Sequence, residues 1–301
     1  MKRAAMMMAI LGMTAGSLAQ SDKPAAQNPP AAQSQTPAAG QAAAAPAAKR
    51  PPQAKTQPEF DAYKAAALLT DPVAQAKAAD DFATKFPDSE LRILLYKAAM
   101  HGFQTSNNGE QMLEMGRKVL ALDGDDPEAL IGVAEVLAER TRDTDLDRDQ
   151  RLDEAMKDAQ RAVVTVDTDV VAPAGTPQEK IDAYKGYVRS SAYSIVGTIL
   201  YNRKDFAGAE SNFHKSIDAF PQQPDPIAVL RLALALDGQG KYPEALKYAN
   251  QAVDLTKENT AAGNAARHER DRLAQLTGAT PAAEAKPAAP GQIPQNQPPK
   301  N

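Results

Sequence analysis

Residues 190–223 read SSAYSIVGTILYNRKDFAGAESNFHKSIDAFPQQ, and this stretch decides the fold. Gly197 has no side chain, so a helix that contains it can approach a second helix closely. Ala209 is small at the point where that second helix would cross the first, and Phe213 fills the gap between them. Pro221 stops the second helix because proline lacks the N–H that a helix interior needs. The stretch therefore predicts two helices packed against each other.

The order of these residues resembles the repeat of the tetratricopeptide family, in which large, small and aromatic residues recur at fixed positions of a 34-residue unit. Two positions differ mildly, since Val196 stands for leucine and Ser216 for alanine. The pattern recurs over residues 226–259. The residues expected to pack within these two units are Tyr193, Gly197, Ala209, Phe213, Pro221, Tyr242 and Ala245. The resemblance implies an all-α fold, a right-handed solenoid of tandem antiparallel helix pairs.

Weaker copies of the pattern precede these two units. They span residues 56–89, 93–126 and 127–168, and the third carries an insertion in its turn. A loop at 168–178 interrupts the array, and residues 261–276 are expected to form a capping helix with a polar outer face. Prolines at 72, 127, 177, 226 and 243 fall near the expected helix starts, where a missing N–H costs little. The folded domain is therefore expected over residues 58–277.

The two flanks differ in composition from the middle of the chain. Residues 20–57 and 278–301 are rich in Pro, Ala and Gln and contain no aromatic residue. Such segments cannot bury enough apolar surface to fold, so both are predicted to be disordered. Lys49, Arg50 and Lys55 close the first flank and could contact an anionic surface, although a passive spacer is the favoured interpretation.

The first nineteen residues have the pattern of a secretory signal. Two basic residues precede an uncharged apolar run over residues 4–18, and small residues Ser17 and Ala19 occupy the two recognition positions before Gln20. The run is shorter than the roughly 20 residues of a spanning helix, which favours cleavage after Ala19 over an uncleaved membrane anchor. The mature protein is then expected to be periplasmic or secreted, without stable membrane insertion.

Composition and motifs argue against catalysis and against nucleic-acid binding. The chain has no cysteine, which excludes disulfides, thiol nucleophiles and cysteine-ligated metals. Its three histidines, His101, His214 and His268, are scattered, and no G-x-S-x-G, Walker or H-E-x-x-H motif occurs. The formal net charge of −4 provides no general attraction for nucleic acid. We therefore predict a protein that is not an enzyme and needs no cofactor.

Alternating acids in the insertion resemble an EF-hand calcium loop. The residues that match its ligand positions are Asp143, Asp145, Asp147, Asp149 and Glu154. Arg148 stands where that loop needs glycine, and Arg142 and Arg151 neutralise the acids nearby. A solvated, salt-bridged loop is therefore the favoured interpretation. A calcium-modulated accessory or small-ligand-binding protein remains the alternative function.

The first helices of stacked pairs line a concave surface in the family that the sequence resembles, and this is where a ligand is expected. Transferred position by position, the groove residues are Lys97, His101, Gln104, Ile131, Glu135, Ser194, Thr198, Tyr201, Leu230 and Leu234. The basic and asparagine residues with which some members bind C-terminal carboxylates are not visible. We therefore expect an extended or helical peptide segment as ligand, and an exported scaffold for envelope assembly or secretion as the function.

Overall fold

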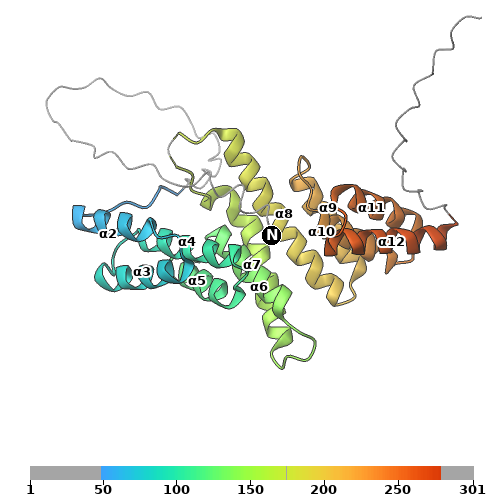
Figure 1. The fold of residues 1–301 in the computed structure, drawn as a ribbon, viewed down its shortest axis with the longest axis horizontal. Coiled ribbons are helices and arrows are strands. Elements are labelled where there is room, and N and C mark those ends of the chain that lie inside the picture. The colour runs from blue at the N-terminus through green and yellow to red at the C-terminus, as the bar shows by residue number, and fades with distance from the viewer. Residues whose placement is uncertain (1–48, 174, 279–301) are drawn as a thin grey trace, which may run out of the picture.

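The computed structural model of the chain describes residues 49–173 and 175–278. Within these two ranges the backbone forms eleven helices and no strand. Their bounds are α2 Gln57–Ala67, α3 Pro72–Lys85, α4 Arg92–Thr105, α5 Gly109–Leu122, α6 Pro127–Arg140, α7 Arg148–Asp169, α8 Gln178–Asn202, α9 Phe206–Ala219, α10 Pro226–Asp237, α11 Tyr242–Leu255 and α12 Ala261–Thr277. Each helix packs against the next, so the chain forms a row from α2 to α12 (Figure 1). The predicted all-α solenoid of tandem helix pairs is confirmed.

Local sequence signals set the start of several helices. Asp71, Asp126 and Asp225 precede α3, α6 and α10, and the side chain of each accepts a hydrogen bond from a backbone N–H in the first helical turn. Those N–H groups have no partner inside the helix, so the aspartate satisfies them. A proline follows each aspartate, at the first helical position, where its missing N–H costs no hydrogen bond within the helix.

The turns inside three of the pairs share one geometry. Asn107, Lys204 and Gly240 have positive φ angles of 58°, 63° and 73°. The residue after each donates its backbone N–H to the carbonyl five positions earlier, at 2.9, 2.9 and 3.0 Å. This pattern ends a helix and satisfies one of its last carbonyl groups. The same reversal therefore links α4 to α5, α8 to α9 and α10 to α11.

Small residues lie where paired helices cross. A Cβ atom on Gly197 of α8 would lie only 2.8 Å from two ring carbons of Phe213 in α9. Phe213, Ala209 and Ala245 have no exposed surface. The remaining residues that we expected to pack lie nearer the surface: Tyr193 is half-buried, Pro221 is exposed and Tyr242 is 38% exposed.

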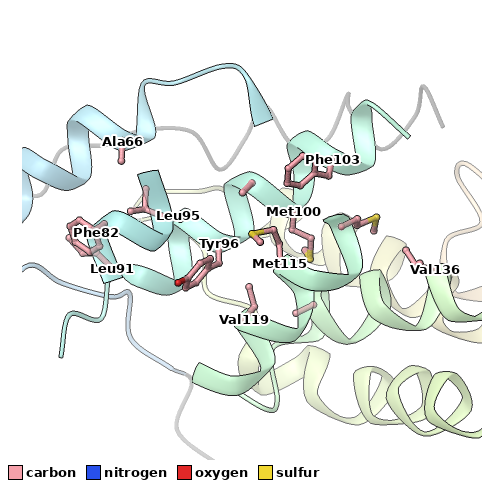
Figure 2. Packing of buried hydrophobic residues seen from close by; sticks show 14 residues of the cluster. Ala66, Phe82, Leu91, Leu95, Tyr96, Met100, Phe103, Met115, Val119 and Val136 are labelled. Atoms are coloured by element: carbon pink, nitrogen blue, oxygen red, sulfur yellow. The ribbon is translucent and has the colours of Figure 1, made fainter. Parts of the chain in front are cut away.

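The N-terminal pairs enclose an apolar cluster (Figure 2). Leu95, Met100 and Phe103 of α4 lie at its centre, with Met115 and Val119 contributed by α5. The exposed fraction of each of these side chains is 3% or less. Apolar contacts therefore hold one side of helix α4. The expected groove residues Lys97, His101 and Gln104 lie on the same helix.

Helices α7 and α8 are longer than the repeated 14-residue helices, with 22 and 25 residues. Helix α8 contacts α6, α7 and α9. Arg189 and Arg203, near its middle and its end, donate hydrogen bonds to Asp167 and Asp153 of α7 at 2.8 and 2.6 Å. Because α8 packs along α7 as well as along α9, it joins the earlier helix pairs to the later ones.

The segment before α2 corrects one expectation. Composition predicted a disordered linker up to residue 57, with Lys49, Arg50 and Lys55 on a spacer. In the structure all three side chains contact acceptors on the helical array itself. Composition misses this because the acceptors are far away in sequence. The predicted signal, the rest of that linker and the tail after residue 278 lie outside the described residues.

Candidate functional site

The expected groove residues lie on the first helices of successive pairs, α4, α6, α8 and α10. Side-chain bonds join these helices directly. Lys97 of α4 places its Nζ atom 2.9 Å from Asp126 and 2.6 Å from Glu128, both at the start of α6. Arg231 of α10 donates to the hydroxyl of Thr198 in α8 at 2.8 Å. Salt bridges and hydrogen bonds between neighbouring pairs therefore hold in place the face that α4, α6, α8 and α10 form.

Lys97 is the centre of a largely buried charge network. The exposed fractions of the Lys97, Asp126 and Glu128 side chains are 20%, 6% and 10%. His101 lies 3.4 Å from Glu128 through its Nε2 atom, and the hydroxyl of Tyr184 in α8 donates to the same carboxylate. The Lys97 ammonium is therefore paired with carboxylates of the protein itself, although we had expected it to face a ligand.

The network fixes the charge states of its members. Burial alone would lower the pKa of Lys97, but the charges of Glu128 and Asp126 raise it above its ordinary value. Burial alone would raise the pKa of Glu128, but the Lys97 ammonium and the imidazole of His101 hold that pKa well below its usual range. Both groups are therefore charged across the physiological pH range.

Glu135 of α6 behaves differently. It accepts one hydrogen bond, from Gln104 of α4 at 3.3 Å. Burial, with a contribution from the nearby charge of Glu139, raises the pKa of Glu135 to about 7. Asp225, before α10, acts in the same direction. A carboxyl group on this face is thus close to half-protonated near neutral pH.

Replacing Glu135 with glutamine is expected to stabilise the fold strongly at pH 8 and only weakly at pH 5. An unfolded glutamate titrates near pH 4.3, whereas Glu135 keeps its proton up to about pH 7. The folded state binds more protons in that interval, so its stability decreases as pH rises from about 4.3 to 7. The amide avoids this loss, so we expect a gain of about 3.5 kcal/mol at pH 8.

Urea unfolding at the two pH values measures this gain. Glu258→Gln is the control, because Glu258 is exposed in the turn between α11 and α12. A gain that is equal at pH 5 and pH 8, or one that the control reproduces, would contradict the assignment to burial of Glu135.

The C-terminal part of the expected groove is partly covered. Leu230 is only 7% exposed and packs with Ala252 of α11 and Ala266 of α12. Leu234 is half-buried against the same cluster. The capping helix therefore occupies a place that we had expected a ligand to fill.

Three other expected residues differ in accessibility. Ser194 and Thr198 are 9% and 7% exposed, and the Thr198 hydroxyl donates to the Ser194 carbonyl at 2.8 Å. Tyr201 is half-buried, with its ring edge-on to Phe206 at 5.4 Å between centroids. Ile131 is also half-buried. The side chains on this face that a ligand can reach are thus chiefly Gln104, Ile131, Glu135 and Tyr201.

The family positions missed three residues on this face: Glu128, Tyr184 and Arg231. Arg231 stands next to an expected position and Tyr184 precedes its repeat, whereas Glu128 is the second residue of the repeat at 127–168 and was not among the expected residues. An acid at the start of α6 and a lysine on the preceding first helix were visible in the sequence. Their contact depends on the spacing between pairs, which the sequence does not specify.

The carboxylates of the acidic stretch at the start of α7 bind separate partners and do not converge on one point. Arg148 binds Asp143 and Asp149, whose side chains are 95% and 81% exposed. Glu154 instead pairs with Arg117 of α5 at 2.9 Å. No three His, Cys, Asp or Glu side chains among residues 49–173 and 175–278 are placed to hold a metal ion.

The same described ranges contain no helix that is both long enough and apolar enough to cross a membrane.

No family model and no curated protein matches the sequence. Several solved structures have a similar fold. A crystal structure of MamA has a TM-score of 0.46 at 18% identity, covering 65% of this chain and 89% of MamA. PilF of Pseudomonas aeruginosa has a TM-score of 0.48 at 18% identity, covering 74% and 87%. A thermophilic TPR protein of Thermus thermophilus has a TM-score of 0.41 at 12% identity, covering 73% and 98%.

These likenesses are too distant to carry the assignment, which rests on the chain's own helices. The helix pairs α8–α9 and α10–α11 share a turn geometry, and buried small residues lie where the two helices of each pair cross. The chain therefore has a tetratricopeptide-like fold.

Proposed function

We propose that the protein is an exported scaffold that binds a peptide segment of a partner protein along the face of α4, α6, α8 and α10. The observation that carries this proposal is the set of bonds between successive first helices, such as Lys97 to Glu128, Gln104 to Glu135 and Arg231 to Thr198. These bonds fix the face before a ligand arrives, so that binding need not order the receptor.

The role is binding and not catalysis in this proposal. Lys97, Asp126 and Glu128, which meet on the face, are already paired with one another. The signal-like start of the sequence supports action in the periplasm or outside the cell, and we propose a task in envelope assembly or secretion. The calcium-modulated alternative has less support, because Asp143, Asp149 and Glu154 are paired with arginines.

A photo-crosslinking amino acid placed at Tyr201 is expected to trap a partner in living cells. Tyr201 is half-buried on the proposed face. The matched control is Val164 of α7, which is 67% exposed and lies on the second helix of its pair. We expect one discrete adduct from position 201 and none of the same mass from position 164, detected by immunoblot and identified by mass spectrometry.

A second variant links the adduct to the face. Gln104→Arg adds a bulky charge at an accessible position two pairs away and leaves the Lys97 network intact. It should reduce the adduct at position 201 several-fold without lowering the melting temperature. The proposal fails if both crosslinking positions give the same adducts, or if the folded Gln104→Arg variant gives an undiminished adduct.

A further inference from the structure

Residues 49–56 cross the turns that join the first helix pairs. Lys55 donates to the carbonyl of Asp88 at 2.7 Å, just before α4. Arg50 binds the Glu90 carboxylate through two nitrogens, at 2.6 and 2.8 Å. Lys49 reaches further and lies 2.7 Å from Asp123, at the end of α5. The segment therefore runs along one edge of the array instead of extending away from α2.

The two ends of the segment are fixed by different forces. At its C-terminal end, Thr56 caps α2 in a reciprocal arrangement with Glu59. Glu59 is only 3% exposed and also accepts the hydroxyl of Ser89. At its N-terminal end, the side-chain contacts are ionic. The C-terminal end is thus part of the α2 start, while the N-terminal end depends on charge.

Lys49 bridges two different helix pairs. Its ammonium group contacts Asp123 after α5 and also Asp169 at the end of α7, and its backbone N–H donates to the carbonyl of Thr168 at 3.4 Å. Burial alone would lower the pKa of Lys49, but hydrogen bonds to the two carboxylates raise it. The bridge therefore stays charged at any physiological pH.

We propose that residues 49–56 form an ionic strap, which holds the first three helix pairs at a fixed spacing and makes the preceding chain leave the array beside α7. One cation lies between two carboxylates and offsets their mutual repulsion across the gap between pairs. The two consecutive prolines, Pro51 and Pro52, limit the conformations of the strap when it is released. Anything tethered to the earlier part of the chain is then attached at the third pair.

The strap can leave the array without unfolding of the helix pairs, because its N-terminal contacts are exposed ion pairs. The side chains of Lys49 and Arg50 are 38% and 63% exposed, so salt screens their pairs. An exposed ion pair of this kind shifts an equilibrium by at most about fivefold. Loss of both Lys49 pairs can therefore increase the open population by at most about 25-fold, and we expect about tenfold, while the apolar core of the pairs is unchanged.

Trypsin cleavage of the full chain after Lys49 tests whether the strap is docked. The double variant Asp123→Asn, Asp169→Asn removes both acceptors and leaves the cleavage site intact. We expect cleavage after Lys49 to be about tenfold faster in this variant, and faster in the wild type at 0.5 M than at 0.05 M salt. Rates are normalised to a small peptide substrate. Asp81→Asn is the control, because it removes only the exposed pair with Lys77 within α3.

A distance measurement tests whether the strap also sets the spacing of the pairs. The chain has no cysteine, so spin labels at Lys77→Cys and Val164→Cys report on α3 and α7 alone. We expect a narrow distance distribution that broadens when the two aspartates are neutralised. Equal cleavage of wild type and double variant at every salt concentration overturns the docked strap. An unchanged distribution after faster cleavage overturns its role in spacing. Helical circular dichroism confirms that each variant is folded.

Discussion

Replacing Gly197 with leucine is expected to unfold the C-terminal helix pairs or to destabilise them by about 3 kcal/mol or more. A single carbon added at this position would already lie 2.8 Å from two ring carbons of Phe213 and 3.1 Å from a third. The Phe213 ring is fully buried, so it has no free space into which it can turn. Overpacking usually costs about 1–3 kcal/mol, and a leucine in contact with a rigid ring belongs at the upper end of that range.

Circular dichroism during urea unfolding measures this loss. Ala209→Leu, on the partner helix α9, should act in the same way because Ala209 is also fully buried. The control is Gly124→Ala, where the nearest atom, the carbonyl oxygen of Leu120, lies 3.7 Å from the added carbon. If Gly197→Leu kept the full helical signal and the wild-type melting temperature, the proposed pairing of α8 with α9 would be wrong.

Replacing Lys97 with methionine is expected to cost about 3 kcal/mol at pH 7. The methionine fills most of the volume of the lysine stem but leaves two largely buried carboxylates, Asp126 and Glu128, without their cation. Removing one partner of a buried ion pair typically costs about 3–5 kcal/mol. The partial exposure of Lys97, 20%, places the expected loss at the lower end.

The loss should depend on pH in a defined direction. The pKa of Glu128 is lowered in the folded state, so the stability that this group contributes is present above its ordinary pKa of about 4.3 and disappears as pH falls through the lowered value. The pKa of Lys97 is raised, so its contribution persists up to the alkaline range. The difference between wild type and variant should therefore be largest above pH 5 and shrink towards pH 2.

Urea unfolding at pH 7 and pH 3 tests this expectation. Lys77→Met is the matched control, because Lys77 and its partner Asp81 are 76% and 67% exposed within one helix. Equal losses in the two variants would show that the Lys97 network is no stronger than a surface pair. A loss at Lys97 that does not shrink in acid would contradict its electrostatic origin.

The helix pairs could be predicted from the sequence because their signals are local. Gly197, Ala209 and Phe213 stand within 17 consecutive residues, and their sizes determine how two neighbouring helices cross. The aspartate–proline starts of α3, α6 and α10 are likewise complete within two residues. Short-range chemistry of this kind can be interpreted without knowing how one pair lies on the next.

The candidate site was harder to predict because it depends on contacts between pairs. Lys97 was expected to face a ligand, yet its partners lie 29 and 31 positions away, at the start of the next first helix. Leu230 was expected to line the groove and face a ligand, yet it is buried in one apolar cluster with Ala266 of α12. The strap joins residues up to 120 positions apart, from Lys49 to Asp169. No periodicity marks such pairs, since they depend on the rise and rotation between repeats.

The length of α8 determines how the molecule responds to force. A helix of 25 residues is about 37 Å long, and it carries hydrogen bonds to α7 on one side and the packing of α9 on the other. These contacts connect the earlier pairs to the later ones along the length of the helix. A force applied at one end of the array is therefore transmitted through α8 to the other end. Bending is then distributed over many small helix–helix displacements and is not concentrated at a hinge.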